Sequence, residues 1–251
     1  MTDTVIDELN EADQAFAGNR LLSTFPRESR ALLEPFGTTV ELAPGDVVLD
    51  RGKDVLSSVF PLGPTMISME VELTGDRTIE VASIGREGAV GGIVSCGHAP
   101  AYSRAHVLVG GPAFRVPMKA LEDAKRRSQF IGNLFCRFSD YLLAQVMQNV
   151  ACNAYHSIPE RTARWLLHAQ DRAGDRIELT QEALAGLLGV QRTTINAVIR
   201  EFSSMGIIFA SRGRVRVIDR VGLKRRSCEC YEALQDHFGS VIGTSGGGPD
   251  C

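Results

Sequence analysis

The stretch LTQEALAGLLGVQRTTINAVIREFSSMGII, residues 179–208, has the pattern of two helices joined by a tight turn. Counted from Gln181, the fifth position is the small residue Ala185, where the two helices would cross, and the ninth is Gly189, which tolerates a left-handed turn. The positions that should be apolar hold Leu184, Leu188, Val190, Ile195 and Val198. This agreement predicts a helix-turn-helix, an element that many proteins use to read duplex DNA.

The second helix of this motif would present polar and basic side chains near its N-terminus, the end that enters the major groove. An arginine suits guanine, an asparagine suits adenine, and a threonine can contact a thymine methyl group or a phosphate. The residues expected to face DNA are Gln191, Arg192, Thr193, Thr194, Asn196 and Arg200. The alternative is an ordinary solvated helix face, which the lack of an acidic residue before Glu201 disfavours.

A β-hairpin is expected directly after Gly206. Two β-prone runs flank the segment Ser211-Arg212-Gly213-Arg214, so this part of the chain resembles the wing of a winged helix. Arg212 and Arg214 would touch phosphates, which position a protein on DNA but carry no sequence information.

The charge of the chain is divided unevenly. Residues 159–226 hold 13 basic and seven acidic residues, a net charge of +6, whereas the whole chain carries −3, which leaves −9 for the remainder. A basic module on an acidic body is typical of a phosphate-binding domain. Charge alone fits an ordinary surface equally well.

The rest of the chain divides into recognisable parts, and together they predict an α+β protein. Between residues 38 and 117, short β-prone runs alternate with turn residues, a pattern typical of an antiparallel sandwich or barrel. We expect a polar, loosely ordered lead-in (1–20), an N-terminal antiparallel β-roll domain (21–127), a long helix (128–156), the winged helix-turn-helix (157–226) and a C-terminal tail (227–251).

The long helix suggests dimerisation. Its apolar residues Phe130, Leu134, Phe138 and Leu142 recur every four positions. A helix of roughly 27 residues is about 40 Å long, more than a compact domain usually needs. We therefore expect these four residues to form a dimer seam. Burial within the chain's own domain is the alternative.

This order of a β-roll, a long helix and a winged helix resembles the Crp/Fnr superfamily of bacterial transcription regulators. The resemblance runs from about Leu21 to Val221, and LTQEALAGLLGVQRTTINAVI is its most specific part. It implies that Arg192 contacts a base and that Thr180 and Gln181 contact the DNA backbone. It also implies a cyclic-nucleotide-binding-like effector domain, and as partners duplex DNA, a second copy of the chain and RNA polymerase.

The effector part departs from that family. The family's cyclic-nucleotide cassette has a glycine and a glutamate, followed by a phosphate-binding arginine beside a small hydroxyl residue. Here Gly91 and Gly92 stand where glycine and glutamate are expected, and Arg104, followed by Ala105, is displaced by one position. A cyclic nucleotide would lack charge compensation there, so we expect an effector pocket that does not bind cyclic AMP, its ligand being unidentified.

Iron–sulfur, haem and other metal sites find less support in the sequence. Cysteines begin only at Cys96, which disfavours an iron–sulfur cluster, and His98 and His106 are weak candidates for haem ligands because lone histidines are usually structural. Cys228 and Cys230 fit a plain pair of thiols better than a metal site, so no metal and no cofactor are expected.

No catalytic motif indicates an enzyme, and a partner-binding module with a vestigial helix-turn-helix is the remaining alternative. Residues 1–16 lack the features of a secretion signal and no apolar run is long enough for a membrane helix. We therefore expect a cytoplasmic protein without a membrane partner.

Overall fold

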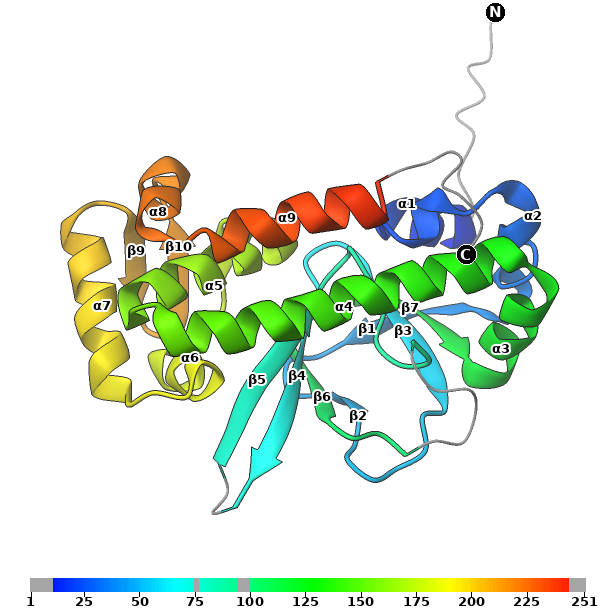
Figure 1. Ribbon diagram of the computed structural model, residues 1–251, viewed down its shortest axis with the longest axis horizontal. Helices are drawn as coiled ribbons and strands as arrows, with labels where there is room; N and C mark the ends of the chain where they lie inside the picture. Colours follow the sequence, from blue (N-terminus) through cyan, green and yellow to red (C-terminus); the bar gives the residue numbers. More distant parts are fainter. Residues whose placement is uncertain (1–10, 75–76, 94–99, 244–251) are drawn as a thin grey trace, which may run out of the picture.

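The computed structural model describes residues 11–74, 77–93 and 100–243 of the 251-residue chain. A β-roll occupies one end, a winged helix-turn-helix the other, and one long helix runs along both (Figure 1). This confirms the predicted α+β architecture. No helix in the described ranges is both long and apolar enough to cross a membrane.

Two antiparallel sheets form the β-roll. One has the strand order β1-β7-β3 and the other β2-β6-β4-β5. Alternate strand residues such as Ile67, Ile84 and Val107 are buried between the sheets, as period-two patterning requires. The strands are β1 (Thr38–Leu42), β2 (Val47–Leu49), β3 (Ser57–Pro61), β4 (Met66–Leu73), β5 (Arg77–Ile84), β6 (Arg104–Val109) and β7 (Gly111–Pro117).

Short helices close the roll at its N-terminal side. They are α1 (Glu11–Gly18), η1 (Leu22–Thr24), α2 (Arg27–Arg30) and η2 (Glu34–Phe36), followed later in the chain by α3 (Met118–Arg127). The expectation of a loosely ordered lead-in is wrong for residues 11–20. Phe16 is fully buried against Phe25 and Phe114, and the Asn19 amide donates hydrogen bonds to two main-chain carbonyls, so this segment belongs to the core.

The long helix, α4 (Gln129–Tyr155), has the length that the sequence predicted, but its four-residue apolar row is not a dimer seam. Leu134 and Phe138 are fully buried within the same chain, against the roll, and Phe130 and Leu142 are half-buried against the same cores. The alternative of burial within the chain's own domain is therefore correct for these residues. The open side of the roll supplies the apolar surface that this row covers.

A different row of α4 faces outward. Leu143, Met147 and Val150 are 52%, 60% and 65% exposed, and Ala154 is exposed one turn further on. Their spacing of four, three and four residues is the heptad spacing of a coiled-coil seam. We call these four residues the α4 stripe.

The winged helix begins after Ser157, whose backbone N–H and side-chain hydroxyl both donate hydrogen bonds to the Glu160 carboxylate, and these two residues form a capping box. Its elements are α5 (Ile158–Ala173), β8 (Arg176–Ile177), α6 (Gln181–Leu188), α7 (Arg192–Ser204), β9 (Ile208–Ser211), β10 (Arg214–Val217) and α8 (Arg220–Arg226). Its core contains Leu184, Ile195 and Phe202, all nearly inaccessible to solvent.

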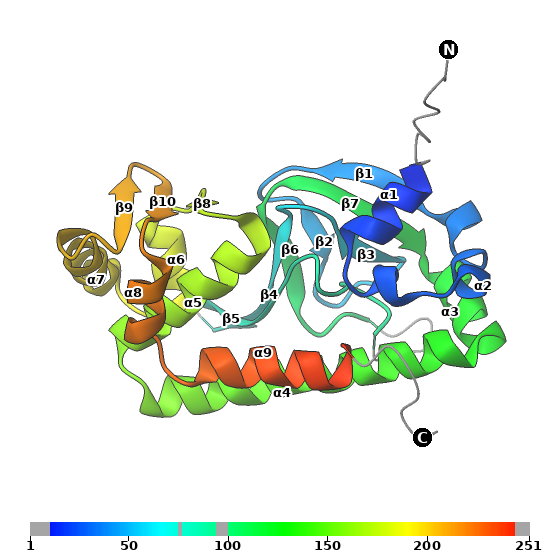
Figure 2. The same ribbon diagram turned by 90° about the horizontal axis from the view of Figure 1, so that it is seen from above.

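The expected C-terminal tail is also helical in part. Helix α9 (Cys230–Val241) runs back along α4 towards the roll (Figure 2). The Phe238 ring packs on Tyr141 of α4 with a centroid distance of 5.0 Å, and the Arg20 guanidinium lies 4.4 Å above the same ring. Helix α9 thus connects the winged helix to the roll, as α4 also does.

Polar contacts fasten α5 directly to the roll. Arg172 Nε lies 2.8 Å from Glu87 Oε1, and both side chains are almost completely buried. The Trp165 indole donates a 2.8 Å hydrogen bond to the Glu80 carboxylate of β5. Burial raises the pKa of Glu80 to about 7, against the opposing effect of the bonds from Trp165 and Ser68. These contacts fix the winged helix against the β-roll.

Candidate DNA-binding interface

The helix-turn-helix has the local geometry that its sequence predicted. The Thr180 side chain caps α6 by accepting a hydrogen bond from the Ala183 N–H, and Ala185 is buried where the helices cross. Gly189 ends α6 with φ 66° and ψ 36°, the left-handed conformation that favours glycine. A β-carbon at this position would also lie 3.2 Å from Ile79 of the roll, so the turn has little free space.

Helix α7 has one buried and one exposed face. Ile195, Val198 and Phe202 pack into the domain, which turns the N-terminal end of the helix outward. The exposed residues among those predicted to face DNA are Gln191, Arg192, Thr193, Thr194 and Arg200. Asn196 is half-buried, and its Oδ1 is shielded from solvent without a hydrogen-bond partner among the described residues. It is therefore the least accessible member of the set.

The start of the helix-turn-helix and the tip of the wing lie in one groove. A hollow of about 470 Å³ is lined by residues from the beginning of α6, the beginning of α7 and the β9–β10 turn. Its lining includes Thr180, Gln181, Arg192 and Arg212, four residues that the sequence assigned to DNA contact. Glu182 also lines it, 3.6 Å from Arg192, but both side chains are more than 60% exposed, so this pair contributes little stability.

The wing itself is a short hairpin. Gly213, with φ 73°, makes its turn, and Arg212 at the tip is exposed and forms no ion pair with any described residue. Arg214 is exposed as predicted, and its Nε lies 3.1 Å from Glu178 Oε1.

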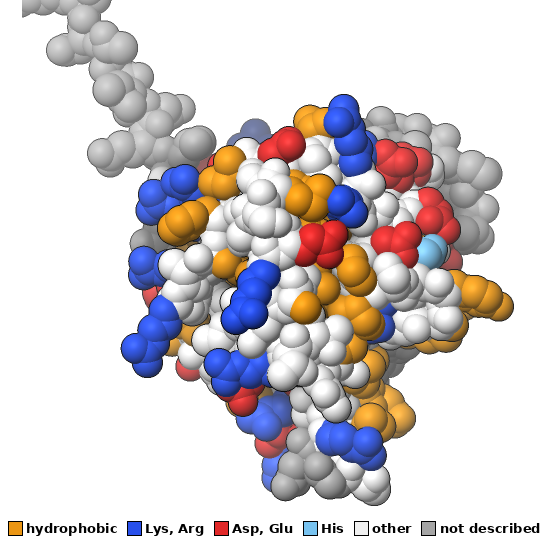
Figure 3. Space-filling view, turned by 90° about the vertical axis from the view of Figure 1, so that its left-hand side faces the viewer, with side chains coloured by type: hydrophobic (Ala, Val, Ile, Leu, Met, Phe, Trp, Pro, Cys, Tyr) orange, Lys and Arg blue, Asp and Glu red, His pale blue; other side chains and the backbone are white. Residues whose placement is uncertain are grey.

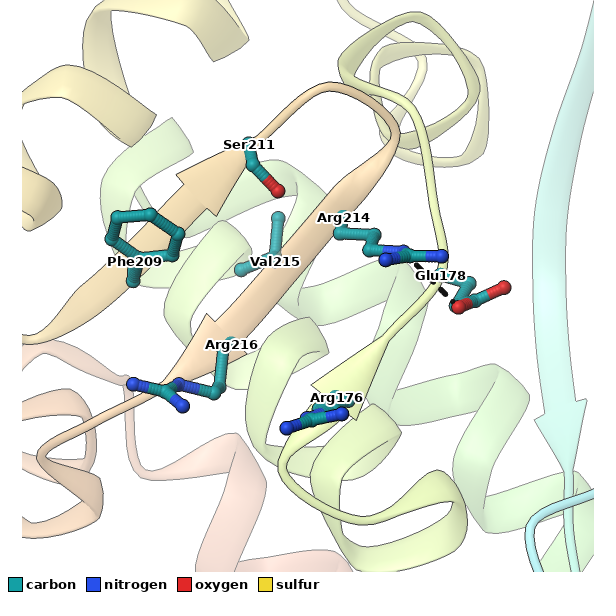
Figure 4. Close-up of a pocket in the computed structure, with 7 residues that line it drawn as sticks. All are labelled: Arg176, Glu178, Phe209, Ser211, Arg214, Val215 and Arg216. Carbon is teal, nitrogen blue, oxygen red and sulfur yellow. Dashed lines mark ion pairs between the residues drawn. The ribbon is translucent and has the colours of Figure 1, made fainter.

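Two further arginines of the wing sheet were not singled out from the sequence. Arg176 of β8 and Arg216 of β10 are register partners, and both line a hollow of about 440 Å³ with Phe209 and Arg214 (Figure 4). Like charges directly opposite each other in a sheet are destabilising, and a bound phosphate would relieve that repulsion. For Arg216 the available signal was the alternation of arginine and valine in Arg214-Val215-Arg216-Val217. This alternation puts Arg214 and Arg216 on one face of a strand.

The basic excess of this region is smaller on its surface than its composition suggests. Arg161, Arg164 and Arg172 are buried inside the chain, and Arg220 is bound to Asp171 and Tyr231. The exposed arginines on the helix-turn-helix and wing are Arg176, Arg192, Arg200, Arg212, Arg214 and Arg216. On the face seen in Figure 3, basic side chains are spread among polar and apolar ones with acidic residues between them. The positive charge is therefore confined to separate spots and does not cover the whole face.

Side chains fill the space beside one of the four residues expected to form an effector pocket. A β-carbon on Gly92 would lie 2.7 Å from Met118 and 3.0 Å from Leu121, so side chains already fill that space. Arg104 is exposed at the start of β6, and Ala105 beside it is buried. Of the two weak haem candidates, His98 lies outside the described residues, and His106 lies 3.7 Å from Glu70.

Comparison with known proteins agrees with this geometry. Residues 160–226 match the Crp-like helix-turn-helix domain family. The chain is 38% identical over 71 residues to the HTH-type transcriptional regulator Cmr of Mycobacterium tuberculosis, a match that covers 28% of each protein. The chain thus matches little more than a quarter of the length of that curated relative.

The likeness to solved structures extends over most of the chain. A transcriptional regulator of the crp/fnr family from Eubacterium rectale matches with a TM-score of 0.62 at 17% identity, over 86% of this chain and 97% of that one. FixK2 from Bradyrhizobium japonicum matches with a TM-score of 0.65 at 13% identity, over 76% and 98%. Residues 160–226 are therefore a Crp-like helix-turn-helix domain, carried by a chain that has the fold of the Crp/Fnr transcription regulators.

Proposed function

We propose that the chain is a homodimeric, sequence-specific DNA-binding transcription regulator. The single observation that carries the proposal is the groove in which the starts of α6 and α7 meet the wing tip. It combines backbone-binding groups with an exposed helix end of the kind that enters a major groove. The regulator class, which is not enzymatic, is also that of Cmr, to which the chain is 38% identical over 71 residues.

The roles of the side chains follow from their positions. Arg192, Thr193 and Gln191 stand at the exposed N-terminal end of α7, where side chains reach base edges. Thr180 and Gln181 at the start of α6, and Arg212 and Arg214 of the wing, are assigned to phosphates. Arg200 lies about two turns beyond the helix start and would reach the backbone.

The α4 stripe supports dimerisation. Exposed apolar residues at heptad spacing on a 27-residue helix form a surface that a second copy of the same helix would cover. Two copies would then present two α7 helices to successive half-sites about one turn of DNA apart. RNA polymerase as a further partner stays a prediction.

The β-roll is proposed to act without cyclic AMP. Gly92 has no carboxylate for a ribose, and Met118 and Leu121 occupy the space beside it. The alternative of a partner-binding module with a vestigial helix-turn-helix would not require an exposed recognition end, whereas residues 191–194 are all exposed.

Selection from a random pool of duplex DNA tests the proposal. The full-length protein should enrich a two-fold symmetric sequence, and log K for that sequence should fall with log salt by about 0.9 for each phosphate contact. Recovery of no common sequence, together with equal affinity for every duplex, would contradict the proposal.

A further inference from the structure

Four potential metal ligands meet where the long helix ends. Cys152 lies in the last turn of α4, His156 directly follows that helix, and Cys228 and Cys230 lie at the junction of α8 and α9. The ligand atoms of all four lie within 4.8 Å of one another. The three cysteines are 0–6% exposed and form a cluster of their own. The fold has thus brought together three thiols and an imidazole from positions up to 78 residues apart.

The distances suit one tetrahedral ion. Cys152 Sγ lies 3.6 Å from Cys228 Sγ, and Cys230 Sγ lies 3.4 Å from His156 Nδ1. Zinc bound at ~2.3 Å to sulfur and ~2.0 Å to nitrogen would place two sulfurs ~3.7 Å apart and a sulfur and a nitrogen ~3.5 Å apart. Both observed distances are within about 0.2 Å of these values, whereas a disulfide would need ~2.05 Å between sulfurs.

The surroundings of the imidazole indicate that it is oriented as a ligand. His156 Nε2 lies 3.2 Å from the Glu229 carboxylate, while Nδ1 points to the sulfurs. A carboxylate on the outer nitrogen holds the proton there and leaves the lone pair of the inner nitrogen for a metal. The Gln148 amide donates a 3.0 Å hydrogen bond to Cys230 Sγ, a contact that favours a thiolate.

Positive charge near the sulfurs fits the same assignment. Three thiolates and one divalent ion leave a net charge of −1, which is costly in a buried site unless it is compensated. Arg161 and Arg164 are 7% and 6% exposed, and Arg161 is close enough to Cys152 and Cys228, and Arg164 to Cys152, for their charges to interact. Neither guanidinium forms an ion pair with any residue in the described ranges, and the Nε of each is buried without a partner there.

We propose that Cys152, His156, Cys228 and Cys230 bind one Zn²⁺ ion in a closed, structural site. Soft thiolates with an imidazole select zinc over the harder divalent ions, and four protein ligands leave no open position for catalysis. The ion fastens the end of α4 to the segment that follows α8, across the His156–Ser157 connection between α4 and the winged helix. It therefore sets the orientation of the winged helix relative to the long helix.

From the sequence we expected no bound metal. This site was missed because its two pairs of ligands lie far apart in the chain. Cys152 and His156 are four residues apart, so they share a face at the end of a helix, but a Cys-x3-His pair followed after 71 residues by Cys-x-Cys matches no familiar zinc motif.

Metal content of the full-length protein, purified without chelators and under reducing conditions, tests the proposal. The wild-type protein should contain one zinc ion per chain, as measured by inductively coupled plasma mass spectrometry. Cys228→Ser should lose at least nine-tenths of it. The matched control is Cys136→Ser, which removes an exposed thiol of α4 outside the cluster and should keep full occupancy.

A second measurement, made on the wild type, does not depend on how the variants fold. Co²⁺ added to the metal-free wild-type protein should give the visible absorption of tetrahedral thiolate cobalt, and Zn²⁺ should abolish it. Glu229→Ala, which removes only the carboxylate on His156, should weaken zinc binding 10–100-fold in competition with a chelator. Absence of zinc together with absence of the cobalt absorption would overturn the proposal. So would a Cys152–Cys228 disulfide found by peptide mapping of a metal-free wild type.

Discussion

The ion pair between Arg172 and Glu87 gives a quantitative test of how the winged helix is held on the β-roll. Arg172 is 4% exposed at its side chain and Glu87 is 10% exposed. The same guanidinium donates a 2.8 Å hydrogen bond to Ser83 Oγ, and the Glu87 carboxylate also accepts from the Gly85 N–H. Arg172→Ala would leave that carboxylate buried without its counter-ion.

The expected cost follows from that stranded charge. Removing one partner of a buried pair typically lowers the free energy of unfolding by about 3–5 kcal/mol. The matched control is Arg51→Ala, because Arg51 and Glu72 form an exposed pair at 3.6 Å, for which we expect about 0–1 kcal/mol. Arg172→Met combined with Glu87→Gln should cost much less than the sum of the two single changes, because neither then leaves a charge behind.

Urea unfolding followed by tryptophan fluorescence is the appropriate assay. Trp165 is the only tryptophan of the chain, and its indole bonds to Glu80 across the same contact between α5 and the roll. All variants must be compared at one protein concentration, since dimerisation would otherwise shift the midpoints. Equal losses for Arg172→Ala and Arg51→Ala, or additive effects in the double variant, would refute a buried clamp between the two domains.

Three further predictions concern other parts of the chain. Burial raises the pKa of Glu80 to about 7. Between about pH 4.5 and 7 the folded state therefore keeps a proton on Glu80 that the unfolded state has released, and the free energy of unfolding falls as pH rises through this range. Glu80→Gln should remove this dependence and gain up to ~3 kcal/mol at pH 8, which thermal unfolding at pH 5 and 8 would measure; an unchanged pH profile would contradict the assignment. Met147→Asp, on the α4 stripe, should give monomers in sedimentation experiments, whereas the exposed change Asp123→Asn on α3 should leave the dimer intact; a monomeric wild type would exclude the stripe as the seam. Arg212→Ala should weaken binding to all duplexes about equally and reduce the salt slope by about one, and a sequence-dependent loss would assign it to a base instead.

The helix-turn-helix could be predicted from sequence because each of its requirements is local. Thr180 caps the start of α6, Gly189 ends the same helix in a left-handed turn, and the apolar positions follow from helical period alone. The order of roll, long helix and wing was predictable for the same reason.

Features that depend on distant contacts could not be read in this way. Spacing shows that α4 has an apolar row, but only the roll decides which face it covers, and Leu134 and Phe138 were for that reason assigned to the wrong surface. The burial of Arg161, Arg164 and Arg172 likewise made the net charge of the module a poor measure of its surface. The contact of Cys152 with Cys228 has no local signal either, because 76 residues separate them.

The measurement that tests the central claim most directly compares Arg192→Ala with wild type on the selected duplex and on a scrambled duplex of the same composition. Arg192 stands at the exposed start of α7, beside the wing tip in the same groove. If it reads a base edge, the variant should lose about 1–3 kcal/mol on the selected duplex, relax the preference at one base pair, and bind the scrambled duplex almost as before. An equal loss on both duplexes would contradict base reading by Arg192, and no loss on either would contradict the placement of α7 in the major groove.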